Sequence, residues 1–155
     1  AQRVHGSKYL RSMIKRSLGR SEEVALPQLD WHSVEARVDT GAYHCAIHCI
    51  NYHVDGSELV VSWANGRQTR HIQFRKATVK SSFGDLQERY LVHLELSVYG
   101  ELVLQEFSLS DRSRMRHPIL LGRTFLKRGF VVDVRRKNVS AKYLSRQTTP
   151  HSAPQ

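Results

Sequence analysis

One tripeptide, Asp39-Thr40-Gly41, carries the clearest chemical signal in this sequence. It follows an apolar stretch that ends at Val38, so the Asp39 carboxylate is expected at the end of a strand, facing a cleft. The Thr40 hydroxyl can brace such a turn, and Gly41 permits close approach of another backbone. These residue types suit a carboxylate that acts on a bound substrate, although the same tripeptide also forms ordinary turns closed by an Asx hydrogen bond.

Apolar residues alternate or form short runs throughout residues 22–143, and this pattern predicts short strands. These strands are the elements that must position Asp39. Asn65-Gly66 predicts a two-residue hairpin turn after Trp63, with a return strand over His71–Phe74. One or two helical turns are expected over Arg123–Arg128, closed by Gly129. This pattern predicts a mostly β domain, either a small barrel or a closed sandwich. The other expected strands are Val24–Leu26, Val34–Asp39, Leu59–Trp63, Tyr90–Val98, Leu102–Leu109, Ile119–Leu121 and Phe130–Val134.

The composition limits the partners and the class of the protein. The chain has 155 residues, of which 40% are hydrophobic, and this suits one domain with a modest core. There is no apolar run of about 18 residues, so a transmembrane helix is not expected. Lys and Arg number 24 against 14 Asp and Glu, and the formal charge of +10 indicates an acidic partner. Because the basic residues are dispersed and no RNA-binding motif is present, nucleic acid is not the expected partner.

The two ends of the chain differ from the strand-rich middle. Residues 1–21 contain six basic residues and no acid, with apolar residues at near-helical spacing. They are expected to form a partly ordered basic tail, with a short amphipathic helix as the alternative. The polar residues 144–155 include two prolines and predict a frayed tail. The expected organisation is therefore a basic segment 1–21, a β domain 22–143 and a polar tail 144–155.

The expected compartment is the cytoplasm, because two cysteines do not form a disulfide-dense scaffold and free thiols suit a reducing environment. The chain begins with Ala1 rather than Met, and we therefore expect that a preceding segment has been removed. A periplasmic location after loss of a signal peptide is therefore the alternative.

Longer strings around these features resemble one bacterial family, and they cover residues 22–135. The family consists of retropepsin-like aspartic peptidases that are often labelled ATP-dependent zinc proteases. Its members occur beside a glutamate ligase that modifies a ribosomal protein. The matching strings are Ala36–Ala42, Ile47-His48, Val79–Gly84, Pro118–Arg123 and Phe130–Val134.

The resemblance implies a retropepsin-like closed acid-protease barrel, mostly β, with one short C-terminal helix. It also implies catalysis by two carboxylates that share one proton. Because the sequence has a single Asp-Thr-Gly, the resemblance implies a homodimer in which Asp39 of each subunit meets on a two-fold axis. Thr40 would then lock the two loops together, and Gly41 would let the substrate backbone approach. The predicted activity is that of an aspartic endopeptidase or peptidase.

The same resemblance implies which residues contact the substrate. A hairpin flap is expected to have its tip near Ser81–Gly84. An acidic or glutamate-rich protein tail is the expected substrate, since basic residues lie near the flap and at Arg112–Arg116. The alternative is a weakly active or inactive module of the same fold that binds an acidic protein or RNA. The expected substrate-binding residues are Ala42, Arg75, Lys80, Ser81, Ser82, Leu121, Gly122 and Arg123.

The sequence departs from the family directly after the turn, where Tyr43–Ala46 replaces an Arg-Thr-Ser type of stretch. The substrate preference is therefore open. On the strand that the resemblance implies here, Cys45 and Cys49 share one face while His44 and His48 share the other. Zinc needs three or four convergent ligands, so we expect half-buried thiols, no metal site and no cofactor. A metal-binding regulator is the least favoured hypothesis, and the role of these four side chains stays open.

Overall fold

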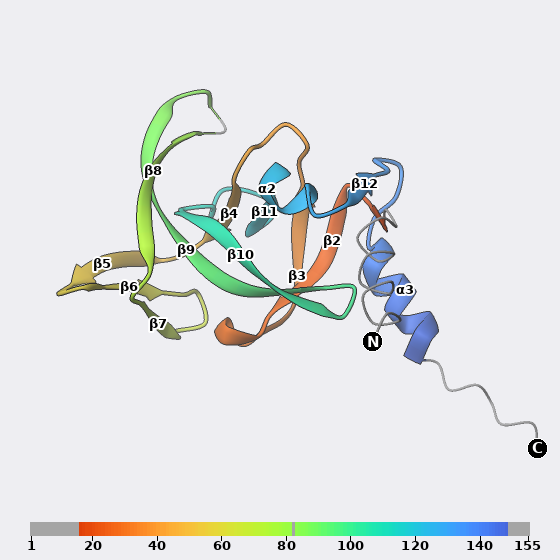
Figure 1. The fold of residues 1–155 in the computed structure, drawn as a ribbon, viewed down its shortest axis with the longest axis horizontal. Coiled ribbons are helices and arrows are strands. Elements are labelled where there is room, and N and C mark those ends of the chain that lie inside the picture. Colours follow the sequence, from red (N-terminus) through yellow and green to blue (C-terminus); the bar gives the residue numbers. More distant parts are fainter. Residues whose placement is uncertain (1–15, 82, 149–155) are drawn as a thin grey trace, which may run out of the picture.

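The computed structural model describes residues 16–81 and 83–148. Residues 1–15 of the basic segment predicted over 1–21 lie outside the described residues, as does Ser82. Residues 16–18 of that segment form a strand, and residue 21 begins another, because both pair with other strands of the domain. The fold is mostly strands, and six of them close into a barrel in the order β10-β4-β11-β3-β2-β9, with β9 pairing back to β10 (Figure 1). The barrel strands are β2 (Ser21–Leu26), β3 (Trp31–Val38), β4 (Cys45–His48), β9 (Leu86–Val98), β10 (Glu101–Ser110) and β11 (Ile119–Leu121).

The hairpin of β9 and β10 is the longest antiparallel pairing in the barrel. Its turn consists of Tyr99 and Gly100, both with positive φ, as the tightest hairpins require. The two strands pair from Val98 with Glu101 to Leu91 with Ser108. Alternating apolar residues of the pair, including Leu94, Leu96 and Phe107, point into the core and are fully buried. The predicted strands over Tyr90–Val98 and Leu102–Leu109 are therefore present.

The β9 strand continues beyond the barrel and pairs with β8 (Phe74–Lys80) to form an arm. Figure 1 shows this arm on the side of the barrel away from the C-terminal helix, with its tip bent back over the barrel. A small sheet of β5 (Asn51–Asp55), β6 (Glu58–Ser62) and β7 (Gln68–His71) lies beside the arm. The hairpin predicted at Asn65-Gly66 is present, but its loop has more than two residues and Phe74 belongs to the arm instead.

The first and last described elements lie together at the opposite side of the barrel. Here β1 (Arg16–Leu18) pairs in parallel with β12 (Phe130–Val132). The helix α3 (Val139–Thr148) lies beside them, continuing beyond residue 144, where the sequence favours a tail. The remaining elements are η1 (Pro27–Leu29) and the predicted short helix, α2 (Arg123–Leu126). No helix within residues 16–81 and 83–148 is long and apolar enough to cross a membrane.

Candidate active site

Asp39 lies in a turn that its own backbone and carboxylate help to close. It follows the last residue of β3, and its N–H donates to the carbonyl of Leu121 at 3.0 Å. The Gly41 N–H donates to Asp39 Oδ1 at 2.9 Å, and the Ala42 N–H donates to the Asp39 carbonyl at 3.3 Å. The side chain is half-buried, so the carboxylate is held in place and still reachable from solvent.

Strand β11 lies between β3 and β4, which brings the Asp39 turn against Gly122. A Cβ added to Gly122 would lie 2.4 Å from the His44 carbonyl oxygen and 2.8 Å from that of Ala42. Since both contacts are with backbone, the position accepts only glycine without a shift of the loop. Arg123 continues this support, because its backbone N–H donates to the Ala42 carbonyl at 2.8 Å and its Nη1 to the Thr40 carbonyl at 3.1 Å.

The tip of the β8–β9 arm covers the cleft beside Asp39. The Ser81 N–H donates to the Asp85 carbonyl at 2.7 Å, and Ser81 Oγ accepts from the backbone N–H groups of Phe83 and Asp85, each at 3.2 Å. Gly84 has a φ of +89°, which L residues with side chains rarely adopt. The hairpin expected at Ser81–Gly84 is therefore present. Lys80, the last residue of β8, and Ser81 line a cavity together with Asp39.

This cavity has a volume of about 360 Å³ and joins several of the predicted site residues. Asp39, Gly41 and Ala42 form one wall, and Lys80 and Ser81 of the arm form another. Residues from β4, β9, β10 and the segment after β10 complete it, and these were not predicted as site residues. The full lining is Asp39, Gly41, Ala42, Tyr43, His44, Ala46, Val79, Lys80, Ser81, Arg89, Ser108, Ser110, Arg112, Leu120 and Arg123.

Of the predicted site residues that the structure describes, four lie outside this lining. Thr40 is exposed beside the turn, whereas Leu121 and Gly122 are buried beneath it. Arg75 is exposed, and its Nε and Nη2 donate to the Glu106 carboxylate at 2.8 and 2.7 Å. This bidentate pair lowers the pKa of Glu106 and engages the Arg75 guanidinium outside the cavity lining.

The cavity beside Asp39 is strongly basic. Its lining contains four cations, Lys80, Arg89, Arg112 and Arg123, and Asp39 is the one acid in it among the described residues. The basic run at Arg112–Arg116 signalled part of this charge in the sequence. Arg89 carries no such signal, because it occurs alone among the alternating residues of β9.

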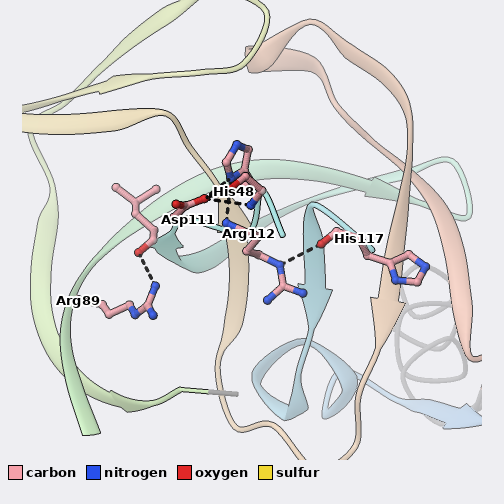
Figure 2. Close-up of polar contacts among 7 residues, drawn as sticks. His48, Arg89, Asp111, Arg112 and His117 are labelled. Carbon is pink, nitrogen blue, oxygen red and sulfur yellow. Dashed lines mark hydrogen bonds and ion pairs between the residues drawn. The ribbon is translucent and has the colours of Figure 1, made fainter. Parts of the chain in front are cut away.

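Arg112 is buried to an extent that is unusual for a cation, with 7% of its surface exposed. Its backbone N–H donates to His48 Nδ1 at 2.9 Å, and its side-chain Nε donates to the His117 carbonyl at 3.0 Å (Figure 2). Burial, followed by the like charges of Arg37 and Arg89, lowers the pKa of Arg112, and the Asp39 carboxylate opposes this effect. The surroundings of Arg112 therefore destabilise the charged form of its side chain.

The neighbouring cysteines are enclosed. The Gly122 N–H donates to Cys45 Sγ at 3.4 Å, and that sulfur lies 3.6 Å from Thr124 Oγ1. Burial raises the pKa of Cys45, and it raises that of Cys49 to about 11. Both thiols are free, and they are buried more completely than the half-buried thiols that the sequence suggests. Within residues 16–81 and 83–148, no group of three or more His, Cys, Asp or Glu side chains is arranged to hold a metal ion.

Two relatives with similar sequences carry the same name. A protein of Shewanella halifaxensis named probable alpha-L-glutamate ligase is 29% identical over 127 residues, and one of the same name from Desulfotalea psychrophila is 28% identical over 130 residues. These matches cover 75% and 77% of this chain, but the chain spans only 28% of the length of either relative.

A solved structure and a family model extend the comparison. The crystal structure of a protein of unknown function (DUF785) from Legionella pneumophila shares the fold, with a TM-score of 0.69 and 19% identity. It matches 82% of this chain and 99% of its own. The family model spans residues 17–143, which include the Asp39 turn, the arm and the Gly122 support. The chain therefore belongs to the RimB-like family, described as retropepsin-like aspartic endopeptidase RimB.

Proposed function

We propose that the protein is a homodimeric aspartic peptidase whose active site forms where two Asp39 turns meet. The observation that carries this proposal is the position of Asp39, held by backbone hydrogen bonds at the edge of a cavity that the arm covers. Among the described residues, one chain supplies one such turn. Peptide hydrolysis of this type needs two carboxylates about 3 Å apart, so a second copy of the chain must provide the other.

In the proposed reaction the two carboxylates share one proton. The ionised carboxylate takes a proton from a water molecule, whose oxygen attacks the peptide carbonyl carbon. The protonated carboxylate, Asp39 of the partner subunit, donates its proton to the carbonyl oxygen. The tetrahedral diol then collapses: the carbon–nitrogen bond breaks, and the leaving nitrogen takes a proton from the carboxylate that removed it from water. One diol hydroxyl returns its proton to Asp39 of the partner subunit as the carboxylic acid forms, which restores the shared proton. Closure of the arm would exclude other water from this step.

An acidic polypeptide, such as a glutamate-rich tail, is the substrate class we propose. Four cations line the cavity against one acid, and this favours a substrate with several carboxylates. The relatives named probable alpha-L-glutamate ligase support the same class, because ligation of glutamate would create such tails. Removal of the tail by hydrolysis would reverse that modification.

The test is cleavage of a peptide with a glutamate-rich tail by the full chain and by Asp39→Asn. We expect the substitution to lower the rate by about 10²–10⁴-fold, because it removes general acid–base catalysis. Circular dichroism and sedimentation should show an unchanged fold and dimer. Retained cleavage by pure Asp39→Asn would contradict the proposal.

Mixing the two forms tests whether the site is shared between subunits. If subunits exchange freely and each site needs both Asp39 residues, activity should follow the square of the wild-type fraction. A site within one chain would give a linear dependence. A linear result, or a strictly monomeric protein that cleaves the peptide, would overturn the proposed dimeric site.

A further inference from the structure

We infer that Arg112 is a specificity-determining residue, whose guanidinium binds a side-chain carboxylate of the peptide in the cleft, with Arg89 as its neighbour. This inference rests on the proposed function, because it assigns the residue that recognises the acidic substrate. Three observations carry it: the unused hydrogen-bond donors of Arg112, the like charges around it, and its place between two cavities.

The guanidinium of Arg112 has donors that the described part of the chain does not use. Its Nε is paired with the His117 carbonyl, whereas within residues 16–81 and 83–148 its two terminal nitrogens form no hydrogen bond and are accessible from the cavity that Arg112 lines. Figure 2 shows the guanidinium turned away from His48 and Asp111. The two free nitrogens of one arginine match the two oxygens of a carboxylate in a bidentate pair.

The charges around Arg112 also favour an anion. Arg37 and Arg89 both repel it, whereas the Asp39 carboxylate attracts it. Arg89 Nη1 donates to the Leu109 carbonyl at 3.3 Å, and its Nη2 donates to the Gln87 side chain, so both of these acceptors are uncharged. A carboxylate bound between these guanidinium groups would relieve the repulsion and pair a buried cation.

The position of Arg112 fits a peptide that runs through the cleft. A second cavity of about 500 Å³ lies next to the cavity of Asp39, and Ser81, Arg89, Ser110 and Arg112 line both. An extended peptide that leaves Asp39 beneath the arm would pass these residues. Because alternate side chains of an extended chain face the same side, a run of glutamates would present one carboxylate to Arg112 in each register.

The test separates recognition from cleavage by working in the Asp39→Asn protein, which binds peptide without cutting it. Binding of a fluorescein-labelled hexaglutamate peptide and of its hexaglutamine counterpart is measured by anisotropy. Adding Arg112→Gln should weaken hexaglutamate binding at least about tenfold, since a charge-assisted bidentate pair is lost, and should leave hexaglutamine binding unchanged. Hexaglutamate binding by Arg112→Lys should be weaker than that of the Asp39→Asn parent and stronger than that of Arg112→Gln, because lysine keeps the charge but not the planar pair of donors.

Arg114→Gln is the matched control, because it removes the same charge two residues away at an exposed position that lines neither cavity. It should change hexaglutamate binding less than about twofold. If Arg112→Gln does not fold, Arg112→Lys and Arg89→Gln decide the question, and each should weaken hexaglutamate selectively. Unchanged hexaglutamate binding in the folded variants, or an equal loss for both peptides, would overturn the inference.

The binding result is independent of the peptidase proposal. If the wild-type protein cleaves neither peptide but binding depends on Arg112 as described, the peptidase proposal fails and the carboxylate site stands. If the wild-type protein cleaves both peptides equally well and Arg112→Gln changes both rates together, the peptidase proposal stands. Arg112 would then act through Asp39 rather than by recognising the substrate.

Discussion

Glu22 and Arg112 are both charged and both buried, with 0% and 7% of their surfaces exposed, but their polar atoms are used differently. The Glu22 carboxylate accepts four hydrogen bonds from the backbone N–H groups of Gly19, Val139 and Ser140 and from the Ser140 hydroxyl, at 2.7–3.0 Å. It thereby joins the start of β2 to the first turn of α3, where the helix dipole also favours an anion. Arg112 is the opposite case, because its two terminal nitrogens form no hydrogen bond among the described residues and stay accessible from the cavity.

This difference distinguishes a buried charge that stabilises the fold from a buried charge that binds a ligand. A buried charge whose hydrogen bonds are completed by the protein stabilises the fold, and its loss should be felt in unfolding. A buried charge with open donors in a cavity costs stability and is useful only when a ligand completes it. The two side chains should therefore respond differently when each is removed.

The largest effect is expected for Glu22→Ala. It would leave three backbone N–H groups without their acceptor, so the free energy of unfolding should fall by about 3 kcal/mol or more. Urea denaturation measures this change. The control is Glu23→Gln, at an exposed neighbouring position, which should change it by less than about 0.5 kcal/mol. A small effect of Glu22→Ala would show that its four hydrogen bonds do not hold α3.

A smaller loss of stability is expected for Gly122→Ala. This variant tests whether the backbone packed against Gly122 is as rigid as the backbone around Glu22. The added carbon would meet backbone oxygens at 2.4 and 2.8 Å. The free energy of unfolding should fall by about 1–3 kcal/mol, and peptide binding should weaken as the Ala42–His44 backbone shifts. In Gly41→Ala the added carbon would meet only Asp39 Oδ1, at 3.2 Å, so this control should lose less stability. Equal losses would contradict the role given to Gly122.

For Arg112→Gln the expected change in the free energy of unfolding is less than about 1 kcal/mol in either direction. The variant gives up the hydrogen bond to the His117 carbonyl but relieves the repulsion from Arg37 and Arg89. Urea denaturation alongside Glu22→Ala measures the contrast directly. A loss as large as that of Glu22→Ala would make Arg112 a structural charge and remove the distinction.

The smallest effect is expected from pH. Burial, with a further contribution from Arg75, lowers the pKa of His44 below its ordinary value of 6.5, while Glu106 opposes the shift. His44 is therefore neutral above pH 6.5, and the cleft owes its charge to groups that stay protonated. Hexaglutamate binding to Asp39→Asn should change less than about twofold between pH 6.5 and 8, and His44→Gln should not alter this profile. Clear strengthening toward pH 6.5 that His44→Gln removes would assign the anion site to His44.

Several parts of the fold and site could be predicted because their signals are local. Alternation over Tyr90–Val98 marks a strand with one buried face, and Ile119–Leu121 before Gly122 marks a buried strand that ends at a close contact. The Asp39 turn could be predicted for the same reason, since a strand, an acid and two small residues follow one another. The dimer, the substrate and the catalytic role of Asp39 stay predictions.

Other parts could not be predicted, because they depend on residues far apart in the chain. The helix α3 lies in polar sequence, and its first turn is held by Glu22, more than a hundred residues earlier. Arg75 looks like a free cation near the flap until Glu106 is placed opposite it. Nothing near Arg89 in the sequence signals that it faces Asp39 across a cavity.

The sequence by itself determined a mostly β chain with one acidic turn, a glycine support and an excess of basic charge. Periodicity and residue type carry that information, since both act over a few neighbouring residues. Only the tertiary structure decided which of the basic residues are buried, paired or open to a ligand. Desolvation and hydrogen-bond completion depend on what the closed barrel brings against each side chain, and for this reason Glu22 and Arg112 differ although both are buried charges.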